Sequence, residues 1–379
     1  MRIAFVYDAV YPYILGGVEK RVWELAHRLV KRGHEVHIYG MQLWEGDKTI
    51  VKGGVTLHGV CQPRKLYSKG KRKTTQAITF GFSVFLPLAR ERFDVVDCQQ
   101  FPYISALSSL ISCRISRSHL VITWHEVWGI YWYEYLGKTG SVGKFLERII
   151  ALSSGKNIAV SEITSNSLKH LVGNSKEITI IPNGIDLSTI EAIRPSESTS
   201  DLIFVGRLIK EKHVDLLLES VKHLKDIYPS IRCTIIGDGP ERSALETKAR
   251  NLEIDANVQF IGFLNDPDEV IARMKAAKVF VLPSTREGFG ISVIEALACG
   301  IPVVTIDHPQ NASRAFISST CGALSRLDSI DMTEKINNVM IHARDMNTTC
   351  ISIARGYDWE TITDIVENYY EDISRNLTR

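Results

Sequence analysis

The sequence lacks the signals that would assign it to a secreted, membrane-spanning or zinc-binding class. Its seven cysteines are odd in number, and none belongs to a Cys-x-x-Cys pair. This pattern favours a reduced, cytoplasmic compartment over a disulfide framework or a structural zinc site. Met1 and Arg2 lead directly into an apolar strand-like run, so no signal peptide is expected. The uncharged stretch at residues 74–89 is too short to span a membrane and contains Pro87.

Repeats of solenoid length and low-complexity tracts are also missing from the sequence. The chain has 379 residues, of which 45% are hydrophobic and 23% charged, a composition typical of a globular protein. A chain of this length exceeds what one hydrophobic core usually serves, so two domains are expected.

Charge is distributed unevenly along the chain, although the net charge is only +2. Residues 1–186 contain 24 Lys or Arg and 15 Asp or Glu, whereas the remainder contains 21 basic and 28 acidic residues. The densest basic stretch is Arg64–Lys73. Anionic lipid headgroups attract such a cluster by about 1 kcal/mol per basic residue. The stretch predicts peripheral contact with an anionic membrane; a solvated loop without a partner is the alternative.

Strand-like runs alternate with helix-like segments along the whole chain, which predicts an α/β fold with parallel sheets. Such runs occur in the first half at residues 3–7, 35–39, 95–97 and 120–124, and in the second half at residues 201–206, 232–237, 258–261 and 279–282. The polar, proline-containing segment 195–200 separates the two series and predicts a linker. Ligands of parallel sheets bind at the carboxyl ends of the strands, so loops that follow strands are the places to look for a site.

The most informative run spans residues 286–302, where Glu287 and Glu295 stand eight positions apart. Gly288-Phe289-Gly290 forms a turn whose backbone can approach a ligand closely, because glycine has no Cβ. The helix that follows offers unpaired N–H groups to an anion, and each glutamate can accept hydrogen bonds from two sugar hydroxyls. The run therefore predicts a nucleoside diphosphate that carries a sugar.

The same run resembles the E-x7-E signature of the family-4 retaining glycosyltransferases, an enzyme family of GT-B fold. The resemblance implies two Rossmann-like domains that face each other across a cleft. We place an acceptor-binding domain at residues 1–195 and a nucleotide-sugar-binding domain at residues 196–356. The helix at residues 357–379 is expected to cross back to the first domain.

Cations for the diphosphate are expected after the first strand of the second domain. Arg207 can bind two phosphate oxygens with its forked guanidinium, and Lys212 acts as a point charge. Both match the cations that the family places after a Gly-Arg turn. A surface Arg and Lys near a helix start is the alternative interpretation.

Two loops of the first domain resemble further family motifs. Gly16 and Gly17 follow the first strand and match the Gly-Gly loop that closes on the diphosphate, although a tight turn alone would also explain them. His125 follows another strand and matches the histidine that the family places over the transferred sugar. It would donate to a sugar hydroxyl or act through its backbone carbonyl; a core histidine is the alternative.

The resemblance also implies the full set of site residues. The catalytic residues are His125, Arg207, Lys212 and Glu287, and the donor-binding residues are Gly16, Gly17, Gly237, Leu264, Glu287, Gly288, Phe289, Gly290, Ile291 and Glu295. No metal ion and no cofactor are expected. Asp266-Pro267-Asp268 spells the motif of metal-dependent glycosyltransferases of another fold, but its proline predicts a helix cap at Asp266 instead. Residues 307–311 depart from the family pattern, so the role of that loop is open.

We therefore expect a metal-independent retaining glycosyltransferase that uses a nucleotide-sugar donor and a glycan or lipid-linked acceptor. The apolar runs Phe80-Gly81-Phe82 and Val84-Phe85-Leu86 and the aromatic loop at residues 128–135 favour an acceptor at a membrane surface. A buried helix at residues 75–91 is the alternative. No nucleic-acid partner is expected, and the location would be cytoplasmic, peripheral at the inner face of the membrane. Two other functions stay open: a nucleotide-sugar 2-epimerase of the same architecture, and a non-catalytic nucleotide-sugar-binding protein.

Overall fold

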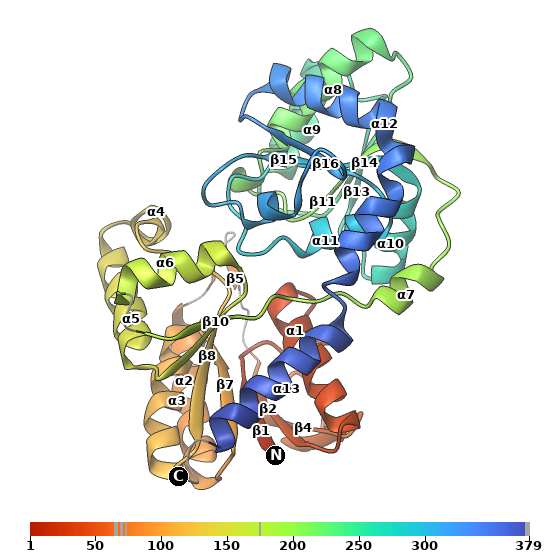
Figure 1. The fold of residues 1–379 in the computed structure, drawn as a ribbon. Helices are drawn as coiled ribbons and strands as arrows, with labels where there is room; N and C mark the ends of the chain where they lie inside the picture. The colour runs from red at the N-terminus through yellow and green to blue at the C-terminus, as the bar shows by residue number, and fades with distance from the viewer. Residues whose placement is uncertain (64–66, 69–70, 73, 174–175, 376–379) are drawn as a thin grey trace. The chain divides into compact units, whose positions relative to one another are not determined.

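The computed structural model describes residues 1–63, 67–68, 71–72, 74–173 and 176–375. The side chains of the predicted basic stretch Arg64–Lys73 lie outside the described residues. The chain forms two compact units: Met1–Asn183 together with Trp359–Arg379, and Gly184–Asp358 (Figure 1).

The first unit is built on an eight-stranded sheet with the order β10-β9-β8-β7-β1-β2-β4-β3. All neighbouring strands are parallel except β3, which is antiparallel to β4. The strands are β1 (Arg2–Val6), β2 (Glu35–Met41), β3 (Thr49–Lys52), β4 (Val55–Cys61), β7 (Val95–Gln99), β8 (His119–Trp124), β9 (Lys156–Ala159) and β10 (Ile178–Ile180), and β5 (Tyr67–Ser68) pairs with β6 (Lys71–Arg72) outside this sheet. The helices are α1 (Gly17–Lys31), α2 (Thr74–Arg90), α3 (Tyr103–Ser116), α4 (Tyr131–Leu136), α5 (Gly140–Ser153), α6 (Glu162–Val172) and α13 (Trp359–Arg375).

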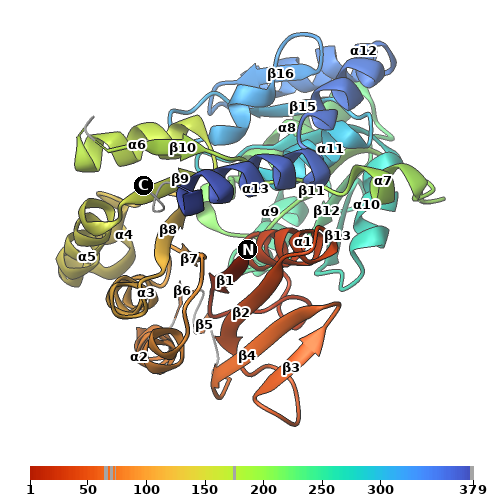
Figure 2. The same ribbon diagram turned by 60° about the horizontal axis from the view of Figure 1, so that its bottom comes forward.

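Helix α13 is held against α1 by apolar burial and by ion pairs, and Figure 2 shows the two helices side by side. Trp359 and Tyr370 are fully buried on its inner face. Arg28 Nε binds Glu360 at 2.7 Å, and Arg32 binds Glu367 at 2.7 Å. The last helix of the chain is therefore part of the first unit.

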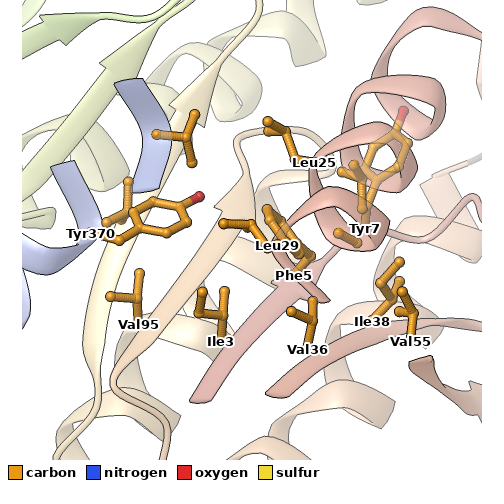
Figure 3. Packing of buried hydrophobic residues seen from close by; sticks show 14 of the residues in the cluster. Ile3, Phe5, Tyr7, Leu25, Leu29, Val36, Ile38, Val55, Val95 and Tyr370 are labelled. Atoms are coloured by element: carbon orange, nitrogen blue, oxygen red, sulfur yellow. The ribbon is translucent and has the colours of Figure 1, made fainter. Parts of the chain in front are cut away.

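Both faces of the first sheet are buried, because side chains alternate along each strand. In β1, Ile3 and Phe5 point into a core shared with α1 and α13, whereas Ala4 and Val6 point into a core shared with α2, α3 and α5. Figure 3 shows the first of these cores, with Tyr370 of α13 above Val95.

The second unit is built on a six-stranded parallel sheet with the order β13-β12-β11-β14-β15-β16. Its strands are β11 (Ser200–Val205), β12 (Cys233–Ile236), β13 (Val258–Gly262), β14 (Ala277–Leu282), β15 (Val303–Ile306) and β16 (Gly322–Ser325). Its helices are α7 (Leu187–Ala192), α8 (Val214–Ile227), α9 (Arg242–Asn251), α10 (Pro267–Lys275), α11 (Ile291–Ala298) and α12 (Ser329–Arg355), with short 3-10 helices η2 (Lys210–Lys212) and η3 (Ala312–Phe316). The predicted α/β architecture of two parallel sheets is confirmed.

Three features of the second unit were not expected from the sequence. Helix α12 and strand β16 belong to no predicted element, because α12 is rich in Asn, Thr and Ser and has a weak apolar period. The unit also begins at Gly184, before the polar segment 195–200. The boundary lies earlier because α7 is bonded to the second unit. Lys275 of α10 donates to the carbonyls of Glu191 and Ile193, at the end of α7, at 3.2 and 2.6 Å.

Candidate functional site

The strand order of the second sheet brings the loops after β11 and β14 together. The chain runs outward from β11 in one direction and from β14 in the other, so these adjacent strands mark a topological switch point. Lys212 follows β11 and Glu287 follows β14, and their side chains form an ion pair. The lysine side chain is 16% exposed and the glutamate 12%. The two residues predicted to bind phosphate and sugar are therefore neighbours.

Hydrogen bonds from backbone and side-chain groups fix the two loops to each other. The Oγ of buried Ser284 donates to the carbonyl of Glu211 at 3.2 Å, and the backbone N–H of Thr285 donates to the same carbonyl at 3.1 Å. His213 Nε2 lies 3.1 Å from Thr285 Oγ1. Lys212 is thus presented by a 3-10 turn that is anchored on both sides.

Glu287 is held by the segment whose family role the sequence left open. Its N–H donates to the carbonyl of Gln310 at 3.0 Å, and its carbonyl accepts from Ala312 at 2.9 Å. Asn311, which is fully buried, donates to Thr305 and to the carbonyl of Ile306. Residues 307–311 therefore support the backbone of Glu287. Sequence reasoning assigned Asn311 no role, although Asn is a typical turn residue because its side chain bonds to the backbone two residues on. Here its Oδ1 accepts from the N–H of Ser313 at 3.1 Å.

The Gly-Phe-Gly turn ends directly in α11. Gly290 has φ +95° and caps the helix, and a Cβ there would lie 2.6 Å from the Cβ of Ser313. Phe289 is buried against Phe316, with ring centroids 5.2 Å apart. The first amides of a helix have no partner within it, so the turn presents those of Ile291 and its neighbours. Gly288 and Glu295 are both partly exposed.

The remaining predicted donor residues lie at the same edge of this sheet. Arg207 is exposed on the loop after β11. Gly237 follows β12, and a Cβ there would lie 1.9 Å from the carbonyl oxygen of Gly206, so close loop packing by itself requires this glycine. Leu264 follows β13 and is partly exposed. The predicted cap at Asp266 is confirmed, because Asp266 Oδ1 accepts from the N–H of Asp268 at 2.9 Å.

The first sheet has its own switch point, between β1 and β7. Gly16 caps α1 and Gly17 is its first residue, and both are exposed. A Cβ on Gly16 would lie 2.7 Å from Oε1 of Glu19, so the carboxylate of Glu19 occupies the space above this glycine. A side chain at position 16 would therefore collide with that carboxylate, so close packing by itself favours glycine here.

His125 lies just beyond β8 and is only partly exposed. Its Nε2 lies 2.8 Å from Gln99 Oε1, and its backbone N–H donates to Gln100 at 3.0 Å. Burial, and secondarily the charge of Arg21, lowers the pKa of His125 to about 3. The imidazole ring is therefore neutral near neutral pH. The backbone carbonyl of His125 accepts from the hydroxyl of Thr164 at 3.4 Å.

A buried polar cluster behind His125 was not found from the sequence. Asp97 on β7 accepts hydrogen bonds from Tyr370 of α13 at 2.5 Å and from Thr123 of β8 at 2.7 Å. Arg21 of α1 is fully buried, donates to Asn183 Oδ1 at 3.1 Å and to the Pro182 carbonyl, and interacts electrostatically with Asp97. Burial raises the pKa of Asp97, and these hydrogen bonds and Arg21 oppose that effect.

The aromatic loop after His125 packs largely on itself. Trp132 is buried, and the ring of Trp128 stacks on Phe101 with centroids 5.4 Å apart. Buried Glu147 of α5 accepts from the backbone N–H groups of Trp128 and Gly129 at 2.8 and 2.9 Å. Sequence reasoning missed Glu147, because one acidic residue in an amphipathic helix resembles a surface position.

The apolar residues expected at a membrane surface are only partly exposed. Phe80 and Val84 are fully buried on the inner face of α2, which corrects their assignment to that surface, whereas Phe82 is 73% exposed. The side chains exposed as well are those of Ile130, Tyr133, Val142 and Phe145 in the α4–α5 region.

No helix in the described part of the chain has the length and apolar character to cross a membrane. Within these residues no group of three or more metal-ligating side chains gathers.

Two family models together match almost the whole chain. Residues 15–189 match the model described as Glycosyltransferase Family 4, and residues 189–356 match the one described as Glycosyl transferases group 1. The change from one to the other falls within α7, close to the boundary between the two units.

Individual proteins are similar over nearly the same length. The phosphatidylinositol N-acetylglucosaminyltransferase gpi3 subunit of Schizosaccharomyces pombe is 22% identical over 374 residues, covering 94% of this chain and 78% of the relative. Sucrose-phosphate synthase from Thermosynechococcus elongatus superposes with a TM-score of 0.82 at 18% identity and covers 98% of both chains. The Anabaena protein HepE, solved in complex with UDP, superposes with a TM-score of 0.74 at 17% identity, covering 98% of this chain and all of the other.

Proposed function

Because the chain belongs to the family-4 glycosyltransferases of GT-B fold, we propose that it transfers a sugar from a nucleoside-diphosphate sugar with retention of configuration. The observation that carries the proposal is the ion pair of Lys212 and Glu287 at the switch point of the second sheet. It joins a cation suited to phosphate with a carboxylate suited to sugar hydroxyls, beside the N-terminus of α11. The UDP bound to HepE is consistent with a diphosphate donor.

Each group has a separate role in this reaction. Lys212, Arg207 and the first amides of α11 stabilise the negative charge that develops on the leaving diphosphate, so no metal ion is required. Glu287 holds hydroxyls of the transferred sugar, and Glu295 the ribose of the nucleotide. In the first unit, His125 is assigned to the transferred sugar, and Gly16 and Gly17 to the diphosphate.

Retention follows if attack occurs on the face from which the diphosphate leaves. The acceptor oxygen forms its bond to the anomeric carbon as the bond to the diphosphate breaks. A phosphate oxygen of the departing group takes the proton of the acceptor hydroxyl. The charge on the diphosphate therefore rises and is then partly neutralised, and preorganised cations stabilise it most at the highest charge.

Donor binding and turnover test this proposal. Wild type and Glu295→Ala are titrated with UDP-, GDP- and ADP-sugars, and the anomeric configuration of the product is read by NMR. We expect one base to be preferred and the variant to bind that donor more weakly. Inversion of configuration would contradict the mechanism. Conversion of the donor into a second nucleotide sugar without an acceptor would indicate an epimerase. Tight donor binding without transfer or hydrolysis would indicate a non-catalytic nucleotide-sugar-binding protein.

For the acceptor we propose a lipid-linked or membrane-surface glycan. The support is the exposed apolar set Ile130, Tyr133, Val142 and Phe145, next to exposed Lys138 and Arg148, and the relative whose name contains phosphatidylinositol. Apolar and basic side chains together favour the interface of anionic lipids.

Co-sedimentation with anionic vesicles at low salt should be reduced by Phe145→Glu. Ile227→Glu, at a position of similar exposure in the second unit, is the control and should have no effect. Wild type that stays in the supernatant would refute the membrane contact.

A further inference from the structure

The ring of His125 is tied to Asp97 by way of a single side chain, that of Gln99. Asp97 and Gln99 are two residues apart on β7 and therefore project from the same face of the sheet. Gln99 pairs in register with Thr123 of β8, and His125 lies two residues beyond Thr123. The strand register thus places all four side chains in one row on the face where Tyr370 of α13 meets Asp97.

The direction of each hydrogen bond in this row follows from the chemistry of the groups. The carboxylate of Asp97 only accepts, and it already accepts from Tyr370 and Thr123. Gln99 therefore turns its NH₂ toward Asp97, with Nε2 3.0 Å from Oδ1. Its amide oxygen is left facing His125 Nε2 at 2.8 Å. An amide oxygen cannot donate, so the proton of the neutral imidazole must lie on Nε2.

We propose that Asp97 and Gln99 are positioning residues that hold His125 in the Nε2–H tautomer, which makes Nδ1 a hydrogen-bond acceptor for a hydroxyl group of the substrate sugar. The inference rests on the proposed assignment of His125 to the transferred sugar. It changes one of the two roles that the sequence allowed, the ring as a hydrogen-bond donor. The ring does not donate to the sugar, because its one N–H is bound to Gln99. The backbone carbonyl of His125 has a second lone pair beside its 3.4 Å contact with Thr164, so it still accepts.

NMR of protein labelled with ¹⁵N-histidine tests the tautomer directly, without any turnover. Long-range ¹H–¹⁵N spectra near neutral pH distinguish the two tautomers, and His125→Gln identifies the signals of this ring. We expect wild type to show Nε2–H. Gln99→Met, which keeps the side-chain length but removes the acceptor, should release the ring to a mixture of both tautomers, with less Nε2–H than in wild type. Gln100→Leu is the matched control, because Gln100 binds the backbone N–H of His125 and not the ring. The His125 ring of the Gln100→Leu variant should show the same tautomer as that of wild type.

Kinetics test whether Gln99 acts through the ring. Gln99→Met should lower kcat/KM for the donor by about tenfold, the value of one hydrogen bond. The same substitution in the His125→Gln background should have little further effect, because the ring it positions is gone. Additive losses would overturn the proposal, as would an Nδ1–H ring in wild type or a Gln99→Met ring with the same tautomer population as wild type. If the tautomer responds as expected but wild type transfers no sugar, the proposed function fails and the positioning of the ring stands.

Discussion

Lys212 and Glu287 form an ion pair although 75 positions separate them in the chain. Lys212 lies in the loop after β11 and Glu287 in the loop after β14, the two strands that form the switch point of the second sheet. Both side chains are mostly buried. In the proposed reaction the lysine binds the diphosphate and the glutamate the sugar. A bound donor therefore competes with the ion pair for the same lysine.

Lys212→Ala should lower turnover by roughly 100-fold or more, because losing one group that stabilises the leaving charge costs on the order of 3 kcal/mol. Lys210→Ala is the matched control, since Lys210 lies in the same 3-10 turn but is exposed. It should lower turnover by less than about twofold. The measurement is the steady-state rate of nucleoside diphosphate release. Near-wild-type turnover of Lys212→Ala would remove this residue from the mechanism.

Glu287→Gln should separate product binding from turnover. The amide no longer neutralises Lys212, so a free nucleoside diphosphate should bind a few-fold more tightly, on the order of 1 kcal/mol. Turnover should fall at the same time, because the carboxylate proposed to hold the sugar hydroxyls is lost. Isothermal titration with the preferred nucleoside diphosphate measures the first effect. Weaker binding by the variant would show that the ion pair and the phosphate do not compete.

Gly290→Ala should destabilise the second unit by more than backbone strain alone. An L-residue at φ +95° costs about 1–2 kcal/mol, and the new Cβ would also lie 2.6 Å from Ser313. Gly33→Ala is the control, because Gly33 has φ +88° with no atom near its Cβ position. Thermal denaturation should give the larger loss for Gly290→Ala. Equal losses would mean that η3 moves aside without cost.

Asp97→Asn should cost about 3–5 kcal/mol in the stability of the first unit, because it leaves the buried guanidinium of Arg21 without a nearby negative charge. Asp364→Asn removes an exposed partner of Arg32, 2.6 Å away, and should cost less than about 1 kcal/mol. Urea denaturation of each variant measures both values. Comparable losses would argue that Asp97 and Arg21 do not interact in solution.

Stability should also depend on pH through His125. Its pKa is about 3 in the folded protein, below its ordinary value of 6.5. As the pH falls from 6.5 toward 3, the unfolded chain binds a proton here and the folded chain does not, so the free energy of unfolding decreases. His125→Gln should therefore lose less stability than wild type between about pH 6.5 and 4. His342→Gln, on the exposed face of α12, should keep the wild-type slope. Parallel slopes for wild type and His125→Gln would contradict the pKa shift.

The alternation of apolar strands and amphipathic helices is a local property, so the sequence by itself predicted two α/β units. It also placed Lys212, Glu287 and His125 in loops that follow strands, where parallel sheets bind ligands. The glycine turn before α11 and the cap at Asp266 are likewise encoded within a few residues. The weakly periodic helix α12 was missed, because its burial depends on the strands it covers and not on its own pattern.

Which of these residues meet was decided only by the tertiary structure. The order of strands around the switch point joins Lys212 to Glu287, and no local signal specifies that order. The environment of His125 depends on Gln99 and Asp97, and through Asp97 on Tyr370, which follows Asp97 by 273 positions. A side chain's charge, tautomer and partners depend on burial and on neighbours brought by long-range packing. The sequence therefore identifies the candidate residues, and the tertiary structure determines their charge, tautomer and hydrogen-bond partners.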